Sequence, residues 1–94
     1  MRIVVERKLY DTETAELVAD NEFANGSNRL NTGRASNLYR TRKGNFFSFH
    51  ETCWQGEHNS IHPLMVDEAK DMYESLPNHS MSWEQAFGEP PEEA

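Results

Sequence analysis

The feature that most constrains the fold is the order of the patterns along the chain, because strand-type segments come first and helical segments come last. The change occurs at Pro63, which cannot donate to a strand ladder and suits the first turn of a helix. Strands followed by helices are typical of α+β domains. We therefore expect an α+β fold, a small antiparallel β-meander of about four strands packed by one main C-terminal helix plus a short terminal helix.

The first predicted hairpin occupies the N-terminal quarter of the chain. Arg2–Tyr10 is rich in apolar and β-branched residues, which predicts a strand. Ala15–Phe23 alternates over part of its length and predicts a second strand, joined to the first by a polar turn. Residues 25–37 are mostly Asn, Gly, Ser, Thr and Arg, so we expect a long loop there.

The second predicted hairpin lies in the middle of the chain. Leu38–Arg42 and Phe46–His50 flank Lys43-Gly44-Asn45, and Gly44 can adopt positive φ in a tight turn. The segment His50–Ser60 is expected to be irregular, and Ser60–His62 could add a short strand.

The helices are predicted from apolar spacing and from capping residues. Apolar residues recur at helical spacing over Leu64–Leu76, and Pro77 ends the pattern. Ser82 begins a second short helix that has Gln85 at the capping-box position and Gly88 as its stop. We expect one domain over residues 1–88 and a flexible acidic tail over residues 89–94, which is rich in Pro and Glu.

Length and cysteine content restrict the class of protein. A chain of 94 residues can build one core, and a deep cofactor pocket is hard to add at this size. Cys53 is the single cysteine, so no internal disulfide can form, and this fits a reducing compartment. Charges interrupt the N-terminus too early for a signal peptide, and no apolar run is long enough to span a bilayer. We expect a cytoplasmic protein without a cofactor and without membrane contact.

The charge is divided between the two halves of the chain. Residues 1–48 hold six acids and eight bases, a net charge of +2, whereas residues 49–94 hold ten acids and one base, Lys70, a net charge of −9. Together they give the overall charge of −7. A small domain with one strongly acidic half is expected to bind something positive.

Several segments resemble a known family. Five segments carry this resemblance: Tyr10-Asp11-Thr12-Glu13-Thr14-Ala15-Glu16, Leu38-Tyr39-Arg40-Thr41-Arg42-Lys43-Gly44 with the aromatic pair after it, Pro63-Leu64, Asp67-Glu68-Ala69 and Trp83–Gly88. Together they resemble a family of small proteins from phages and other mobile elements. The resemblance implies a counter-defence role in a bacterial host cell, of which anti-CRISPR action is the best-known kind. It implies no enzymatic activity and carries over no catalytic residue.

The first candidate site is acidic. Asp67, Asp71 and Glu74 form a stripe opposite the apolar face of the predicted main helix. Asp67 and Asp71 repel each other, and only Lys70 offers local relief. An ordinary solvated helix face is one explanation. The alternative is a surface that binds a basic patch of a defence protein or CRISPR effector and so occludes a nucleic-acid or nuclease-recruitment site. The predicted partner-binding residues are Asp67, Glu68, Asp71, Glu74 and Trp54.

The second candidate site is basic. Arg40, Arg42 and Lys43 interleave with Tyr39 and the aromatic pair in the predicted 38–50 hairpin. Basic and aromatic residues on a sheet can bind single-stranded nucleic acid, which would make the protein a small regulator. The same residues are also explained as core aromatics and as arginines that pair with nearby carboxylates or protect an edge strand.

Two further constellations have weaker support. His50, Cys53, His58 and His62 have a spacing close to that of a zinc knuckle, although one Cys with three His is an uncommon structural set and we expect no metal. Cys53 beside a histidine can be drawn as a nucleophile and base, but the sequence has no phosphate loop, nucleophile elbow or helical metalloprotease motif. We therefore expect a binding protein and not an enzyme.

Overall fold

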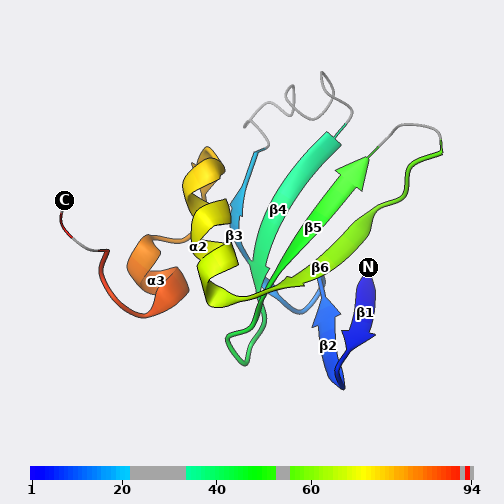
Figure 1. The fold of residues 1–94 in the computed structure, drawn as a ribbon, viewed down its shortest axis with the longest axis horizontal. Helices are drawn as coiled ribbons and strands as arrows, with labels where there is room; N and C mark the ends of the chain where they lie inside the picture. The colour runs from blue at the N-terminus through cyan, green and yellow to red at the C-terminus, as the bar shows by residue number, and fades with distance from the viewer. Residues whose placement is uncertain (22–33, 53–55, 92, 94) are drawn as a thin grey trace.

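The computed structural model describes residues 1–21, 34–52, 56–91 and 93, and this part of the chain forms two antiparallel sheets and two helices (Figure 1). The α+β class is confirmed. The prediction of about four strands is wrong, because the described residues contain seven. The larger sheet has the order β6-β5-β4-β3-β7. Its strands are β3 (Glu16–Asp20), β4 (Arg34–Arg40), β5 (Phe46–Thr52), β6 (Ser60–Leu64) and β7 (Asn78–His79).

The smaller sheet is a hairpin of two strands, β1 (Arg2–Val5) and β2 (Lys8–Asp11). The single strand predicted over Arg2–Tyr10 is therefore wrong. The chain reverses at Glu6 and Arg7, which have φ of 51° and 66°, and Val5 pairs with Lys8. A two-residue turn with positive φ at both positions normally contains Asn or Gly. Because Glu6 and Arg7 are neither, the sequence does not predict this turn.

The predicted pairing of the first and second segments is also wrong. β3 pairs with β4 on one side and with β7 on the other, and not with the N-terminal hairpin. Asp11 ends β2 and redirects the chain, since its Oδ1 accepts a hydrogen bond from the Glu13 N–H at 2.9 Å and its carbonyl accepts one from the Ala15 N–H at 3.0 Å. This turn separates the hairpin from the larger sheet.

The second predicted hairpin is confirmed as β4 and β5. The turn is closed by backbone hydrogen bonds from Thr41 N to Asn45 O at 2.8 Å and from Gly44 N to Thr41 O at 2.9 Å, with Gly44 at φ 89°. The strand bounds differ from the prediction, because β4 begins at residue 34 and ends at Arg40, two residues before the predicted Arg42, and β5 continues to Thr52. The last four residues of the predicted 25–37 loop thus belong to β4, and the rest lie outside the described residues.

Both edges of the larger sheet differ from expectation. The short strand at Ser60–His62 is confirmed, but β6 continues through Pro63 to Leu64. Pro63 therefore does not begin the helix, and its missing N–H is tolerated because β6 is an edge strand. At the opposite edge, β7 has only two residues, which are too few to leave a pattern in the sequence.

The two helices confirm most of the capping signals. Helix α2 (Val66–Ser75) ends before Pro77 but begins two residues later than predicted, with Met65 as its N-cap. Helix α3 (Trp83–Phe87) has the predicted capping box, in which Ser82 Oγ accepts from the Gln85 N–H at 3.2 Å and Gln85 Oε1 accepts from the Ser82 N–H at 2.9 Å. Gly88 ends it at φ 79°.

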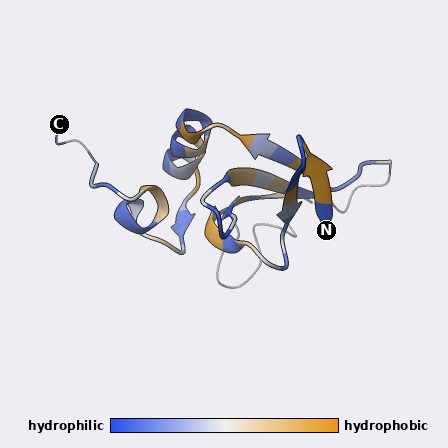
Figure 2. Cartoon of the chain, turned by 90° about the horizontal axis from the view of Figure 1, so that it is seen from below, coloured by the Kyte–Doolittle hydropathy of each residue, from blue (hydrophilic) through white to orange (hydrophobic). Residues whose placement is uncertain are grey.

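The larger sheet has a hydrophobic core on each face. Residues of one core come from the sheet and from both helices, and they include Leu38, Phe46 and Tyr73. The other core contains Tyr10 and Phe47 and is covered by the β1–β2 hairpin. Figure 2 shows the hydrophobic residues concentrated in the strands. Because side chains alternate along a strand, the neighbours Phe46 and Phe47 enter opposite cores. The molecule therefore has three layers: helices, sheet and hairpin.

Candidate functional site

The acidic stripe lies on the outside of α2. Asp67, Asp71 and Glu74 are exposed, and they project from the side of the helix opposite the buried Ala69 and Leu76. None of the three forms an ion pair within the described part of the chain. We call Asp67, Asp71 and Glu74 the acidic face of α2.

Glu68, the fourth predicted acidic contact, has a structural role. Its Oε1 accepts a hydrogen bond from the Met65 backbone N–H at 2.9 Å. This contact satisfies one of the orphan donors at the start of α2, and the negative charge is favourable at that end of the helix dipole. Glu68 is therefore less available to a partner than the acidic face is.

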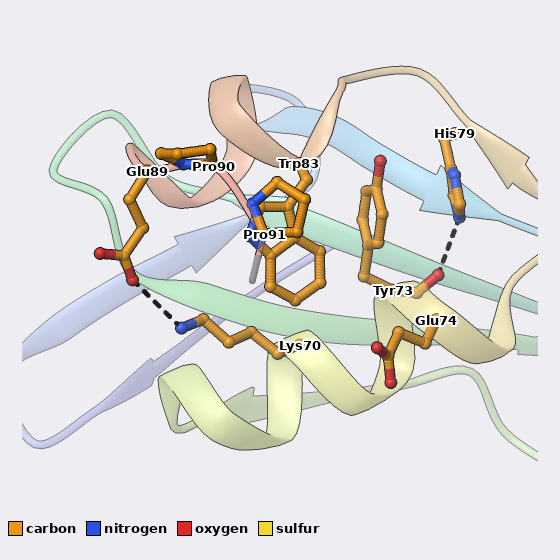
Figure 3. A pocket seen from close by; sticks show the side chains of 8 residues that line it. All are labelled: Lys70, Tyr73, Glu74, His79, Trp83, Glu89, Pro90 and Pro91. Atoms are coloured by element: carbon orange, nitrogen blue, oxygen red, sulfur yellow. Dashed lines mark hydrogen bonds and ion pairs between the residues drawn. The ribbon is translucent and has the colours of Figure 1, made fainter. Parts of the chain in front are cut away.

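Lys70 does not neutralise the acidic face. Its Nζ lies 3.5 Å from Glu89 Oε1 and 5.8 Å from the ring centroids of both Trp83 and Phe87, so it points toward α3 and the C-terminal segment (Figure 3). The expected local relief of the acidic stripe by Lys70 is thus absent. Lys70 is the one base in α2, and within the described part of the chain it pairs with Glu89 and not with these three carboxylates.

A groove of about 640 Å³ adjoins the acidic face and shares Glu74 with it (Figure 3). The rings of Tyr73 and His79 stack in it with centroids 3.9 Å apart, and His79 Nε2 donates to the Tyr73 carbonyl at 2.8 Å. Pro90 and Pro91 also line the groove, so the beginning of the predicted tail lies against the helices.

Two large apolar side chains are exposed at the start of α2. Met65 is 74% exposed and Val66 is 51% exposed. Met65 lies within the apolar spacing predicted for the helix over Leu64–Leu76, but the helix begins after it, and the side chain is exposed to solvent. We call Met65 and Val66 the apolar rim, because they lie next to Asp67 in the sequence. Trp54, the predicted aromatic anchor, lies outside the described residues.

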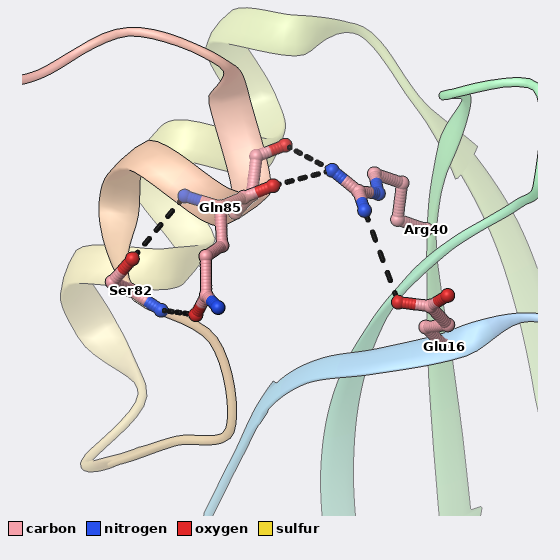
Figure 4. A network of polar contacts seen from close by, with 5 residues as sticks. Glu16, Arg40, Ser82 and Gln85 are labelled. Carbon is pink, nitrogen blue, oxygen red and sulfur yellow. Dashed lines mark hydrogen bonds and ion pairs between the residues drawn. The ribbon is translucent and has the colours of Figure 1, made fainter.

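Arg40, the central residue of the basic candidate, is engaged in the fold. Its Nη1 donates to the backbone carbonyls of Gln85 and Ala86, the latter at 3.2 Å, and Nη2 lies 3.8 Å from Glu16 Oε2 (Figure 4). Tyr39 is also engaged, since its ring stacks on Phe47 with centroids 5.3 Å apart and an interplanar angle of 8°. Both residues are half-buried and engaged in contacts within the fold, whereas the nucleic-acid prediction requires them to be free for a ligand.

Arg42 and Lys43 do remain exposed at the β4–β5 turn. They line a hollow together with Arg7 and Lys8 from the β1–β2 hairpin. No sequence pattern predicts that these two distant basic segments meet, because their proximity depends on how the hairpin packs on the sheet.

The structure brings two of the predicted zinc ligands together. His50 on β5 and His62 on β6 have ring centroids 5.8 Å apart. Cys53 lies outside the described residues, and His58 is exposed. Among the residues that the structure describes, no three His, Cys, Asp or Glu side chains gather as a metal site would require.

His50 lies in a groove beside α2 that has both polar and apolar lining residues. Burial lowers the pKa of His50 from its usual value of 6.5, and the charge of His62 adds to this effect. Its Nδ1 is 3.0 Å from Ser36 Oγ on β4, and the groove, of about 500 Å³, also contains Asp71. Ser36 Oγ is the one hydrogen-bond partner that the described residues give the ring, so no carboxylate orients it as in a catalytic triad.

No protein-family model, curated protein or solved structure matches the chain. The resemblance to phage and mobile-element proteins therefore stays a prediction, and so does the absence of enzymatic activity. Among the described residues, no helix is both long enough and apolar enough to cross a membrane.

Proposed function

We propose that the protein is an inhibitor of anti-CRISPR type, carried by a phage or mobile element, that binds a bacterial defence complex. The acidic face of α2 docks on a basic surface of a protein subunit and prevents nucleic acid or a nuclease from reaching it. The observation that carries this proposal is that Asp67, Asp71 and Glu74 are exposed and have no ion-pair partner among the described residues.

Repulsion within the acidic face lowers the stability of the free protein, and this supports a role in binding. Asp67 and Asp71 lie at i and i+4, and Asp71 and Glu74 at i and i+3, so like charges repel by about 0.2–0.5 kcal/mol per pair. Glu74 also lies near the C-terminal end of the helix dipole, which disfavours negative charge. A partner that carries Lys and Arg removes this repulsion on binding.

The apolar rim supports a protein partner over a free cation. Protein interfaces combine a desolvated apolar centre with charged groups around it. Met65 and Val66 supply exposed apolar area beside Asp67, and methionine adapts readily to different partner surfaces. The charged residues would then guide association, while the apolar rim contributes the buried contact.

The test is an inhibition assay against a panel of purified CRISPR effector complexes, with binding measured in parallel. We expect the native protein to inhibit at least one complex and to bind it more weakly as salt rises. The triple variant Asp67→Lys, Asp71→Lys and Glu74→Lys should reduce affinity by about tenfold or more, because three attractive contacts become repulsive.

The matched control reverses three exposed acids elsewhere, as Glu6→Lys, Glu13→Lys and Glu93→Lys, and changes the net charge equally. This control should retain inhibition. A triple variant of the acidic face that folds and still inhibits would refute docking through α2. Failure of the native protein to inhibit any complex would refute the defence target.

A nucleic-acid-binding regulator that uses the 38–50 hairpin is our second proposal. It is favoured by the exposure of Arg42 and Lys43 at the turn. It ranks second because Arg40 holds α3 and Tyr39 packs on Phe47, so the hairpin lacks the exposed base-stacking surface that single-strand binding normally uses.

A further inference from the structure

Two basic turns that are distant in the sequence line the same hollow. Arg7 and Lys8 belong to the β1–β2 hairpin, and Arg42 and Lys43 belong to the β4–β5 turn. Figure 1 shows both turns at the lower end of the fold. The four cations line one hollow of about 350 Å³, which we call the basic hollow.

No ion pair neutralises these four cations among the residues that the structure describes. All four side chains are exposed, and none forms an ion pair within the described part of the chain. The overall charge of the protein is −7, so four unpaired cations around one concavity are unusual for this molecule. Like charges held close together repel each other, and an anion placed between them relieves that repulsion.

The backbone that presents Arg7 is strained. Glu6 and Arg7 have φ of 51° and 66°, in the left-handed region that favours Gly and Asn. Retaining two charged residues at these positions disfavours the folded state, and such outliers gather at ligand-binding positions. Glu6 does not line the basic hollow, whereas Arg7 does.

Hydrogen bonds close the β4–β5 turn that contributes to the hollow. The Asn45 N–H donates to Thr41 Oγ1 at 3.1 Å, and the backbone bonds between Thr41 and Asn45 close the turn that holds Arg42 and Lys43. Thr14, Thr41 and Asn45 also line the hollow and add neutral polar groups. A site of this kind is largely formed before its ligand arrives.

We propose that the basic hollow binds phosphoryl groups. Guanidinium groups match phosphate oxygens with paired hydrogen bonds, and lysine ammonium groups add point charges. Among the described residues that line the hollow, none is aromatic, so the ligand is held by its phosphates and not by stacking of a base. The phosphates can belong to a nucleic-acid backbone or to a free nucleotide.

The test uses the full chain and three probes: a fluorescent single-stranded oligonucleotide, ATP and inorganic phosphate. We expect at least one probe to bind at low salt. Binding should weaken by about tenfold or more in the double variant Arg42→Ser and Lys43→Ser. If the oligonucleotide binds and ATP displaces it, backbone phosphates occupy the site. If only ATP or phosphate binds, the ligand is a small molecule.

Substitutions at the strained turn separate binding from folding. Arg7→Gly and Glu6→Gly each relieve one left-handed position, so both should raise the midpoint of urea unfolding. Only Arg7→Gly should weaken phosphate binding, because only Arg7 lines the hollow. Arg2→Ser, which removes one charge outside the hollow, should leave binding within about twofold of the native value.

Two results would overturn the proposal. One is that no phosphate probe binds at low salt. The other is that binding persists unchanged in the folded Arg7→Gly protein and in the Arg42→Ser, Lys43→Ser protein. Because these variants do not alter α2, neither result bears on the proposed inhibition of a defence complex, which is tested by the variants of the acidic face.

Discussion

His50 shows how one residue can couple folding to pH. Its ring is partly buried between β4, β6 and the groove beside α2, and its pKa is lowered mainly by that burial. The unfolded chain, with a histidine pKa of 6.5, therefore takes up a proton at a higher pH than the folded chain does. Folding stability is unaffected above the unfolded value and falls as the pH drops from 6.5 toward the lowered folded value.

We expect His50→Gln to flatten this dependence. The variant lacks the titrating ring, so its free energy of unfolding should change less between pH 6.5 and about 5 than that of the native protein. Urea unfolding at a series of pH values measures the difference. His62→Gln should raise the pKa of His50, measured from ring proton shifts in NMR, because the charge of His62 contributes to the lowering.

His58→Gln is the matched control, since His58 is exposed and no ring contact with this pair is found among the described residues. It should leave the titration of His50 in place. A His50→Gln protein whose stability falls with acidity as steeply as the native protein would show that another group governs the response.

The residues that carry the family resemblance mostly serve the fold. Asp11 forms the turn after β2, Gly44 supplies the positive φ of the β4–β5 turn, and Phe46 and Phe47 enter the two cores. Arg40 bonds carbonyls of α3. These positions made the turns and core aromatics predictable from sequence. They give no direct information about a partner, since their side chains are used internally.

Helix α3 depends on a residue from another element. It spans five residues and has no basic residue in its last turn. Arg40 from β4 supplies the positive charge by donating to the carbonyls of Gln85 and Ala86. A cation at the C-terminal end of a helix is favourable, and its hydrogen bonds satisfy carbonyls that the helix leaves free.

We therefore expect Arg40→Ala to destabilise the protein by about 1–2 kcal/mol, because charged hydrogen bonds to α3 are lost. Urea unfolding measures the change, and faster amide hydrogen exchange over residues 83–88 would localise it to α3. Arg42→Ala is the matched control, because Arg42 is exposed on the same hairpin and should cost less than about 0.5 kcal/mol. Equal stability of the two variants would contradict a role for Arg40 in holding α3.

At the scale of elements, helix ends and turns could be predicted from local sequence signals, but the pairing of strands could not. The α3 boundaries followed from Ser82, Gln85 and Gly88, and the β4–β5 turn followed from Gly44, because each signal acts within a few residues. The turn at Glu6 and Arg7 has no such signal. The pairing of β3 with β7 joins segments far apart in the chain, and no local pattern determines it.

The charge distribution of the whole molecule has opposite effects on stability and on binding. Within the helices and strands, much of the negative charge of the C-terminal half lies on the acidic face of α2. Positive charge gathers at the basic hollow, where Arg7 and Arg42 meet. The sequence indicated both an acidic and a basic candidate surface. The basic hollow was not predictable, because it is created by three-dimensional packing of the hairpin beside the sheet.

We expect salt to stabilise the free protein and to weaken its complex. Screening lowers repulsion on the acidic face, so the urea midpoint should rise between about 10 and 150 mM salt. The variant Asp71→Asn, Glu74→Gln should be about 0.3–1 kcal/mol more stable at low salt and less sensitive to salt. Glu13→Gln, Glu93→Gln is the control with the same charge change at exposed positions. Equal salt sensitivity of the two variants would show that general charge, and not α2, controls stability.

The two edges of the larger sheet affect how copies of this molecule can meet. β6 carries Pro63, and β7 has only two residues, so neither edge offers a long row of free backbone donors and acceptors. Strand-to-strand joining, the usual route by which exposed sheets polymerise, is disfavoured at both sides. Copies of the protein are therefore not expected to join through the edges of the larger sheet, and such joining would not cover the acidic face or the basic hollow.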